Sequence, residues 1–246
     1  MALARFDVPG RATIWAVDDA WFNVTGPQND KYPIAGRLSN WDTITDLGVL
    51  EMALKAEFEN TGNPNVGYLL ALVRVCRKEN YALCLASFED FEHDFSLANK
   101  KQTACLVDVK YEQKGEEGNS WGVDLVQRLL KGGRPVCDLF FVTAAKEFVT
   151  ERIRAHFTDS SWWPLRSIPV VDKPIDIEPH GQNEFERLEA ELDAFARYFA
   201  MGLGPDNQVR QMVKSLLDAR VLPHPSAIGE LRTHLPDDFF FVDLFY

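Results

Sequence analysis

Short, almost continuously apolar segments alternate along this chain with longer segments of helical periodicity. The apolar segments are 12–17 (ATIWAV), 81–87 (YALCLAS), 104–109 (ACLVDV), 136–144 (VCDLFFVTA) and 167–174 (SIPVVDKP). Between them, segments such as 66–80 and 121–133 repeat apolar residues every three or four positions, as an amphipathic helix does. Strands that alternate with helices predict a mostly parallel sheet, because a parallel crossover needs a helix that covers one face. We therefore expect a three-layer α/β fold.

The composition narrows the class of protein. The 246 residues carry a formal net charge of −11, which argues against a nucleic-acid partner because phosphate binding needs a basic surface. No apolar run approaches the roughly 20 residues that cross a bilayer, and the first residues lack the apolar core of a secretory leader. The four cysteines lie in apolar segments without metal-ligand spacing, which predicts reduced, buried thiols. We expect a cytoplasmic protein that binds neither membrane nor nucleic acid.

The region 20–65 does not follow the alternation of strands and helices. It is rich in Asn, Asp, Pro and Gly, and we interpret it as an insertion that forms a lid or an interaction surface. One segment inside it, 46–60, predicts a helix with a single apolar face. The residues of that face are Leu47, Leu50, Leu54 and Phe58.

The region 179–246 reads as a helical C-terminal extension of a first domain that spans 1–178. Its first helix carries an apolar stripe at alternating three- and four-residue steps. The stripe consists of Phe185, Leu188, Leu192, Phe195 and Phe199. We expect this helix to pack on its own domain, while a homodimer seam stays open as an alternative. The final segment, DDFFFVDLFY, is too apolar for a free tail and is expected to pack back or to meet a partner.

Polar side chains gather at the carboxyl ends of the predicted strands, which is where ligands bind in an open parallel sheet. Asp18 and Asp19 follow the first strand, and the third, fourth and fifth strands end near Asp108, Thr143 and Lys173. Three neighbouring carboxylates repel one another unless a cation intervenes, and Mg²⁺ prefers carboxylate and water oxygens. Asp108 can then act as a nucleophile toward a phosphoryl group. Thr143 and Lys173 would bind the phosphoryl oxygens.

Four of these segments, taken together, resemble the signatures of response-regulator receiver domains. They are IWAVDD, CLVDVK, FFVTAA and PVVDKP, in the order and on the strands that the family uses. WGVDLVQRLL is similar to the family's third helix, where a Gly-x-x-Leu run is usual. The resemblance covers roughly 12–19 and 66–174. It implies a chemotaxis-regulator-like domain with a doubly wound, flavodoxin-like sheet of five parallel strands and helices on both faces.

The same resemblance assigns roles in two-component signalling. Mg²⁺ would be bound by Asp18, Asp19, Asp108 and the backbone carbonyl of Lys110. Asp108 would be the phospho-acceptor, and Thr143 and Lys173 would complete the site. The implied partners are a sensor histidine kinase or phosphotransfer protein and a downstream protein that receives the signal. The protein would not be an enzyme that turns over a metabolite, because only self-phosphorylation and autodephosphorylation are expected.

Two other functions remain open at this point. Val170 stands where the family normally has a switch aromatic, which favours a receiver-shaped interaction module that is never phosphorylated. A Mg²⁺-dependent phosphatase with an aspartyl nucleophile is the third hypothesis. Such haloacid-dehalogenase-like enzymes place a second Asp two residues after the nucleophile, where this chain has Lys110, so we rank it last.

Overall fold

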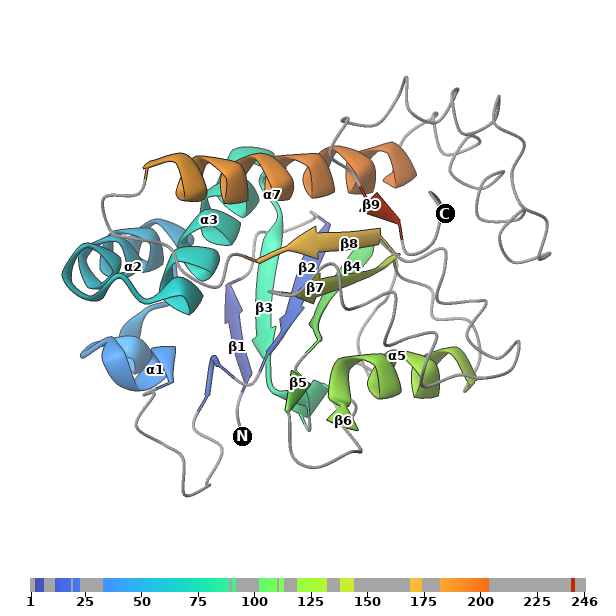
Figure 1. Cartoon of the computed structure of the whole chain (residues 1–246). Helices are drawn as coiled ribbons and strands as arrows, with labels where there is room; N and C mark the ends of the chain where they lie inside the picture. The colour runs from blue at the N-terminus through green and yellow to red at the C-terminus, as the bar shows by residue number, and fades with distance from the viewer. Residues whose placement is uncertain are drawn as a thin grey trace.

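The computed structural model describes residues 3–6, 12–18, 20–22, 33–88, 90–91, 102–109, 111–112, 119–131, 138–143, 169–173, 182–203 and 240–241. The strands are β1 (Leu3–Phe6), β2 (Thr13–Val17), β3 (Ala82–Ala86), β4 (Thr103–Asp108), β5 (Tyr111–Glu112), β6 (Asn119–Ser120), β7 (Asp138–Thr143), β8 (Pro169–Asp172) and β9 (Phe240–Phe241). The helices are α1 (Ile34–Arg37), the 3₁₀ helix η1 (Trp41–Thr43), α2 (Leu47–Thr61), α3 (Pro64–Glu79), α5 (Trp121–Lys131) and α7 (Gln182–Leu203). The chain therefore forms an α/β fold, as its sequence predicts (Figure 1).

The main sheet has the strand order β1-β3-β2-β4-β7-β8-β9, and β5 and β6 form a separate short ladder. Neighbouring strands from β3 to β8 are parallel. The sheet is nevertheless mixed, because β1 pairs with β3 and β9 pairs with β8 in the antiparallel direction. These edge strands were not predicted, since four residues and two residues are too short to give a recognisable apolar run. β9 comes from the apolar final segment, of which the two described residues, Phe240 and Phe241, pair with the sheet as predicted.

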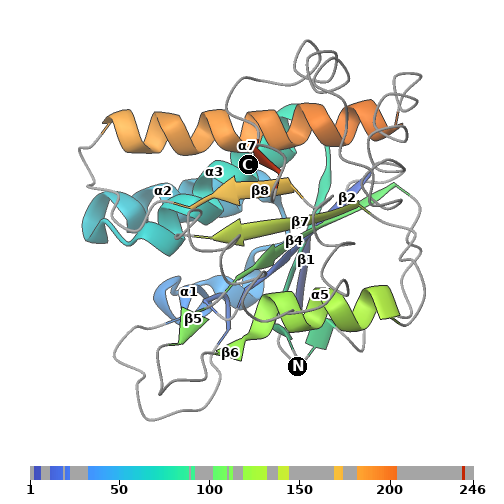
Figure 2. The ribbon, with the colours of Figure 1, turned by 45° about the vertical axis from the view of Figure 1, so that its right-hand side comes forward.

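The sheet separates two apolar cores, because alternate residues of each strand point to opposite faces. On one face, strand residues such as Leu106 and Phe140 pack with α2, α3 and α7. On the other face, residues such as Val107 and Phe141 pack with α5. Figures 1 and 2 show α5 on one side of the sheet and α3 and α7 on the other. Helices therefore cover both faces, which explains why the central strands are apolar almost throughout.

Helix α2 forms where the sequence of the insertion predicts a helix, and its four predicted apolar residues are buried. Asp46 caps its first turn by accepting hydrogen bonds from the backbone N–H groups of Gly48 (2.7 Å) and Val49 (3.1 Å). Gly62 ends the helix in the left-handed region (φ 60°), and Asn63 directly caps α3. The helices α2 and α3 thus form a tight hairpin whose buried residues join the first core. The described part of the insertion adds a layer to the fold.

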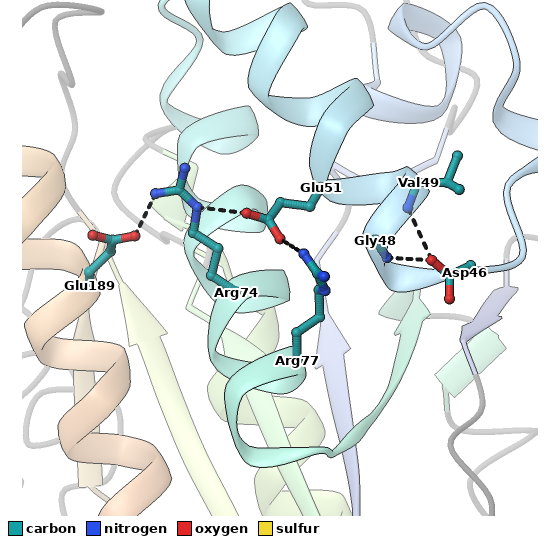
Figure 3. A network of polar contacts seen from close by, with 7 residues as sticks. All are labelled: Asp46, Gly48, Val49, Glu51, Arg74, Arg77 and Glu189. Carbon is teal, nitrogen blue, oxygen red and sulfur yellow. Dashed lines mark hydrogen bonds and ion pairs between the residues drawn. The ribbon is translucent and has the colours of Figure 1, made fainter.

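Helix α7 packs on its own chain through the predicted apolar stripe. Phe195 meets Phe140 of β7 edge-to-face with ring centroids 4.7 Å apart, and Phe185 lies against Phe58 of α2 at 5.5 Å. Polar contacts reinforce this face, as Figure 3 shows: Arg74 of α3 binds Glu189 of α7 at 2.7 Å and Glu51 of α2 at 3.1 Å. Arg77 also pairs with Glu51. The stripe is therefore occupied within the chain. The predicted boundary between 178 and 179 falls outside the described residues.

Two further expectations concern the class of protein. None of the helices in the described ranges combines the length and the apolar character that crossing a membrane requires. Cys76, Cys84 and Cys105 are buried thiols that form no disulfide, as predicted, and Cys137 lies outside the described residues. Burial raises the pKa of the Cys76 thiol, because the thiolate would lose its hydration in the core.

Candidate functional site

The carboxyl ends of β2, β4, β7 and β8 lie next to one another, and backbone hydrogen bonds fix the residues that follow them. The Asp18 N–H donates to the Ala86 carbonyl of β3 (3.1 Å), so the chain stays in the sheet one residue beyond β2. The Lys173 N–H donates in the same way to the Thr143 carbonyl (2.8 Å). Asp108 is paired in register with Val142. The sheet itself therefore sets the positions of the site residues.

The Lys173 ammonium joins two of the predicted carboxylates. Its Nζ donates a hydrogen bond to Asp18 Oδ2 at 2.7 Å and lies 3.6 Å from Asp108 Oδ1. The side chains of Lys173, Asp18 and Asp108 are 9%, 3% and 13% exposed, so this ion cluster is largely removed from water. Buried charges of this kind depend strongly on one another, because removal of one partner leaves the other uncompensated.

Both oxygens of Asp18 are engaged. While Oδ2 accepts from Lys173, Oδ1 accepts from the backbone N–H of Ala20 at 2.8 Å. The second contact turns the chain away from the sheet into the insertion. The base of the insertion is then closed by hydrogen bonds from Ile34 N–H to the Ala20 carbonyl (3.0 Å) and from Ala35 N–H to the Trp21 carbonyl (3.1 Å). The insertion thus begins beside the site, and residues 34–35 are tied back to its first residues.

Asp108 also contacts the first turn of α5 through its backbone. A Cβ atom placed on Gly122 would lie 2.0 Å from the Asp108 carbonyl oxygen, closer than any side chain can approach. Only glycine therefore allows α5 to begin so near the end of β4. The glycine of the predicted Gly-x-x-Leu run is therefore the residue that permits the close approach of α5 to the backbone of the candidate nucleophile.

Of the other predicted site residues, Thr143 is described by the structure, whereas Asp19 and Lys110 are not. Thr143 is buried at the end of β7 and is paired in register with Asp172, the residue before Lys173. Within the described ranges no cluster of three or more metal-ligating side chains occurs, and the two carboxylates of the site are those of Asp18 and Asp108. The structure thus brings Asp18, Asp108 and Lys173 into contact.

Two aromatic residues of the site were not predicted. The Lys173 Nζ lies 5.2 Å from the centroid of the Tyr68 ring, and Tyr68 stacks on Trp21. Tyr68 belongs to a continuously apolar stretch of α3, so its sequence pattern is that of any core aromatic. Burial, followed by the negative charges of Asp18 and Asp108, raises the pKa of Tyr68 well above its ordinary value of 10.0.

Comparison of this chain with protein-family models, with curated proteins and with solved structures found no match. The site must therefore be interpreted from its own chemistry.

The site combines two carboxylates with one ammonium. Two carboxylates at a sheet edge offer the hard oxygen ligands that Mg²⁺ prefers, and their shared contact with one ammonium shows that they face a common point. The ammonium offers a donor to an anionic ligand at the same point. The described residues therefore supply two oxygen ligands of the kind that Mg²⁺ prefers, Asp18 and Asp108.

Proposed function

We propose that this protein is a response-regulator-like signalling protein that accepts a phosphoryl group on Asp108 with Mg²⁺. The observation that carries the proposal is the Lys173 ammonium, which lies 2.7 Å from Asp18 and 3.6 Å from Asp108 at the carboxyl edge of a parallel sheet. An isolated pair of buried carboxylates would be unfavourable, and one lysine offsets only one of the two negative charges, which leaves a cluster suited to receiving a cation such as Mg²⁺.

The strand order supports the resemblance to receiver domains. When the parallel strands β2, β3, β4, β7 and β8 are numbered along the chain, their spatial order is 2-1-3-4-5, which is the order of a flavodoxin-like sheet. In such a sheet the order reverses beside the first and third strands, and ligands bind at that point. Those strands are β2, which precedes Asp18, and β4, which ends in Asp108. The site thus lies where this fold is expected to bind a ligand.

The chemistry that the residues would perform is the transfer of a phosphoryl group to a carboxylate oxygen. An Asp108 oxygen attacks the phosphorus of a phosphodonor, and the bond between phosphorus and the donor atom breaks. That atom is nitrogen in a phosphohistidine and oxygen in acetyl phosphate, and the leaving group departs with the electron pair of the broken bond. Mg²⁺, when bound by Asp18, Asp108 and the predicted Asp19 and Lys110 carbonyl, would neutralise charge on the phosphoryl oxygens. Because its Nζ lies 3.6 Å from Asp108 Oδ1, Lys173 could form an ion pair with the phosphoryl oxygens of the acyl phosphate on Asp108. Water would later release inorganic phosphate and restore the carboxylate.

The proposed function implies particular protein partners and a cellular compartment. The phosphoryl group would come from a sensor histidine kinase or a phosphotransfer protein, and the signal would pass to a downstream protein. Free buried cysteines fit a reducing compartment, so we place the protein in the cytoplasm. We assign no metabolite-converting activity to the chain.

A phosphorylation-independent interaction module is the second candidate, and Val170 favours it. Val170 is fully buried in the core beneath α5, so this strand position holds no aromatic ring that could change rotamer on phosphorylation. If this candidate holds, the protein should bind its partner equally well with Asp108 intact or replaced by Asn.

Intact-protein mass after incubation with acetyl phosphate separates these candidates. We expect one Mg²⁺-dependent phosphoryl adduct on the wild-type chain and none on Asp108→Asn. Asp138→Asn is the matched control, because Asp138 lies at the opposite end of the sheet, on the first residue of β7. That variant should be phosphorylated like the wild type. A folded wild-type chain without an adduct would overturn the proposal, and metal-dependent hydrolysis of a generic phosphate ester would instead favour the phosphatase.

A further inference from the structure

The Tyr68 side chain reaches the site from α3 and contacts the lysine that joins its carboxylates. The Lys173 Nζ lies over the Tyr68 ring, 5.2 Å from its centroid. Tyr68 is 2% exposed, so water does not compete for this face of the ammonium. An ammonium has three N–H donors, and Asp18 and Asp108 lie 2.7 and 3.6 Å from it. The aromatic face therefore supplies a further favourable contact to a desolvated cation.

Trp21 fixes the ring in this position. The two rings are stacked, with planes 9° apart and centroids separated by 5.9 Å. Trp21 is itself fully buried, and its Nε1–H donates to the Ala16 carbonyl of β2 at 2.9 Å. The chain around Trp21 is held by the hydrogen bonds at the base of the insertion. The Tyr68 ring is thus held between a rigid support and the Lys173 side chain.

We propose that Tyr68 is a positioning residue of this site, whose ring face holds the Lys173 ammonium between Asp18 and Asp108 and whose own position is fixed by Trp21. An ordinary core aromatic would need only apolar neighbours, whereas this ring lies beside a cation that bridges two carboxylates. The placement of the ammonium does not depend on the proposed function. Its consequence for phosphoryl transfer rests on that function.

The ring face, and not the hydroxyl, makes the contact. Within the described part of the chain the Tyr68 hydroxyl has no hydrogen-bond partner. Tyr68→Phe therefore keeps the contact with Lys173. Tyr68→Leu removes the face, and Tyr68→pentafluorophenylalanine keeps the shape of the ring while it reverses the charge distribution that attracts a cation. The fluorinated variant preserves the core if the leucine variant fails to fold.

The first test measures how strongly Lys173 is held, without any phosphodonor. The folded proteins are treated briefly with an amine-reactive reagent, and modification of Lys173 is measured by peptide mass relative to Lys55, whose side chain is 58% exposed. We expect the relative labelling of Lys173 to rise about tenfold in the leucine and fluorinated variants and to stay at the wild-type level in Tyr68→Phe. Equal labelling of the fluorinated variant and Tyr68→Phe would overturn the proposal.

The second test measures phosphorylation at saturating acetyl phosphate and Mg²⁺. The rate should fall about tenfold in the fluorinated variant and be restored in Tyr68→Phe, because the ammonium must face the transferred group. The two proposals fail in different ways. If the wild-type protein forms no phosphoryl adduct but the variants show the expected labelling of Lys173, only the proposed function is contradicted. If all variants are phosphorylated at the same rate and Lys173 is labelled equally in all of them, only the role of Tyr68 is contradicted.

Discussion

At the scale of single residues, the site depends on a glycine that has no side chain, Gly122, as much as on its charged residues. Gly122 lets the first turn of α5 approach the backbone of Asp108, and the approach leaves no room for a methyl group. The contact is between backbone atoms, which cannot move aside as the end of a flexible side chain can. The position of the candidate nucleophile is therefore coupled to the identity of residue 122.

Replacement of this glycine should be costly. We expect Gly122→Ala to lower the free energy of unfolding by about 1–3 kcal/mol, because β4 and α5 must separate, even though alanine favours helices. Gly36→Ala in α1 is the control, since its Cβ would meet only Pro33 at an ordinary 3.5 Å. That variant should be neutral or slightly more stable. Urea unfolding of both proteins measures the difference, and equal stability would mean that the close approach imposes no strain.

At the scale of elements, α7 belongs to the same core as the sheet. Its apolar stripe is buried against α3 and β7, and its charged residues pair with α3 through Arg74–Glu189 at 2.7 Å and Lys78–Asp193 at 2.9 Å. The pairs are partly exposed and contribute little by themselves, so the aromatic contacts hold the helix. A receiver-like domain that ends before this helix, at 178, would leave those contacts open to water.

The Phe195 ring provides the test. Phe195→Ala should lower the free energy of unfolding by about 3–5 kcal/mol, because a fully buried ring is replaced by a cavity next to Phe140. Arg197→Ala, on an exposed position of the same helix, should change it by less than about 0.5 kcal/mol. Urea unfolding followed by circular dichroism should show one transition in each case. Two separate transitions would show that α7 and the sheet unfold independently.

Much of this architecture is visible in the sequence, for physical reasons. Strands β2, β3 and β4 are buried on both faces and therefore read as apolar runs, and α2 shows its face through Leu47, Leu50, Leu54 and Phe58. The contact among Asp18, Asp108 and Lys173 could be anticipated because strand ends are recognisable positions. Tyr68 and Trp21 were missed because a ring that faces a cation has the same sequence pattern as a ring in a core. Strands β1 and β9 could not be predicted, because each is defined by its pairing with a strand that is distant in the sequence and not by a local sequence pattern.

At the scale of the whole molecule, buried ionisable groups make folding sensitive to alkaline pH. The pKa of Tyr68 is raised, mainly by burial, well above the 10.0 of an exposed tyrosine, and burial also raises the pKa of Cys76. Both groups stay protonated in the folded chain at a pH where the unfolded chain has begun to release the protons. The unfolded state then binds fewer protons, so stability falls as pH rises.

The stability of the wild-type chain should therefore decline above about pH 9, by up to ~1.4 kcal/mol per pH unit for each such group. The stability that these groups contribute is fully present below that pH. Tyr68→Phe should decline less steeply above about pH 10, since it lacks the phenol that ionises only on unfolding. Urea unfolding at a series of pH values measures the two curves. Parallel curves would show that Tyr68 does not ionise on unfolding in this range.

The ion pair between Lys173 and Asp18 joins residues that are 155 positions apart in the chain. Contacts of such long range carry a large loop-closure entropy, because the two ends of the intervening chain must be brought together. During synthesis on the ribosome, the carboxylate after β2 emerges long before the lysine after β8. A nascent or prematurely ended chain would therefore carry Asp18 and Asp108 without the ammonium that contacts both. Under the proposed function, such a chain would accept a phosphoryl group only once β8 has joined the sheet and brought Lys173 to the site.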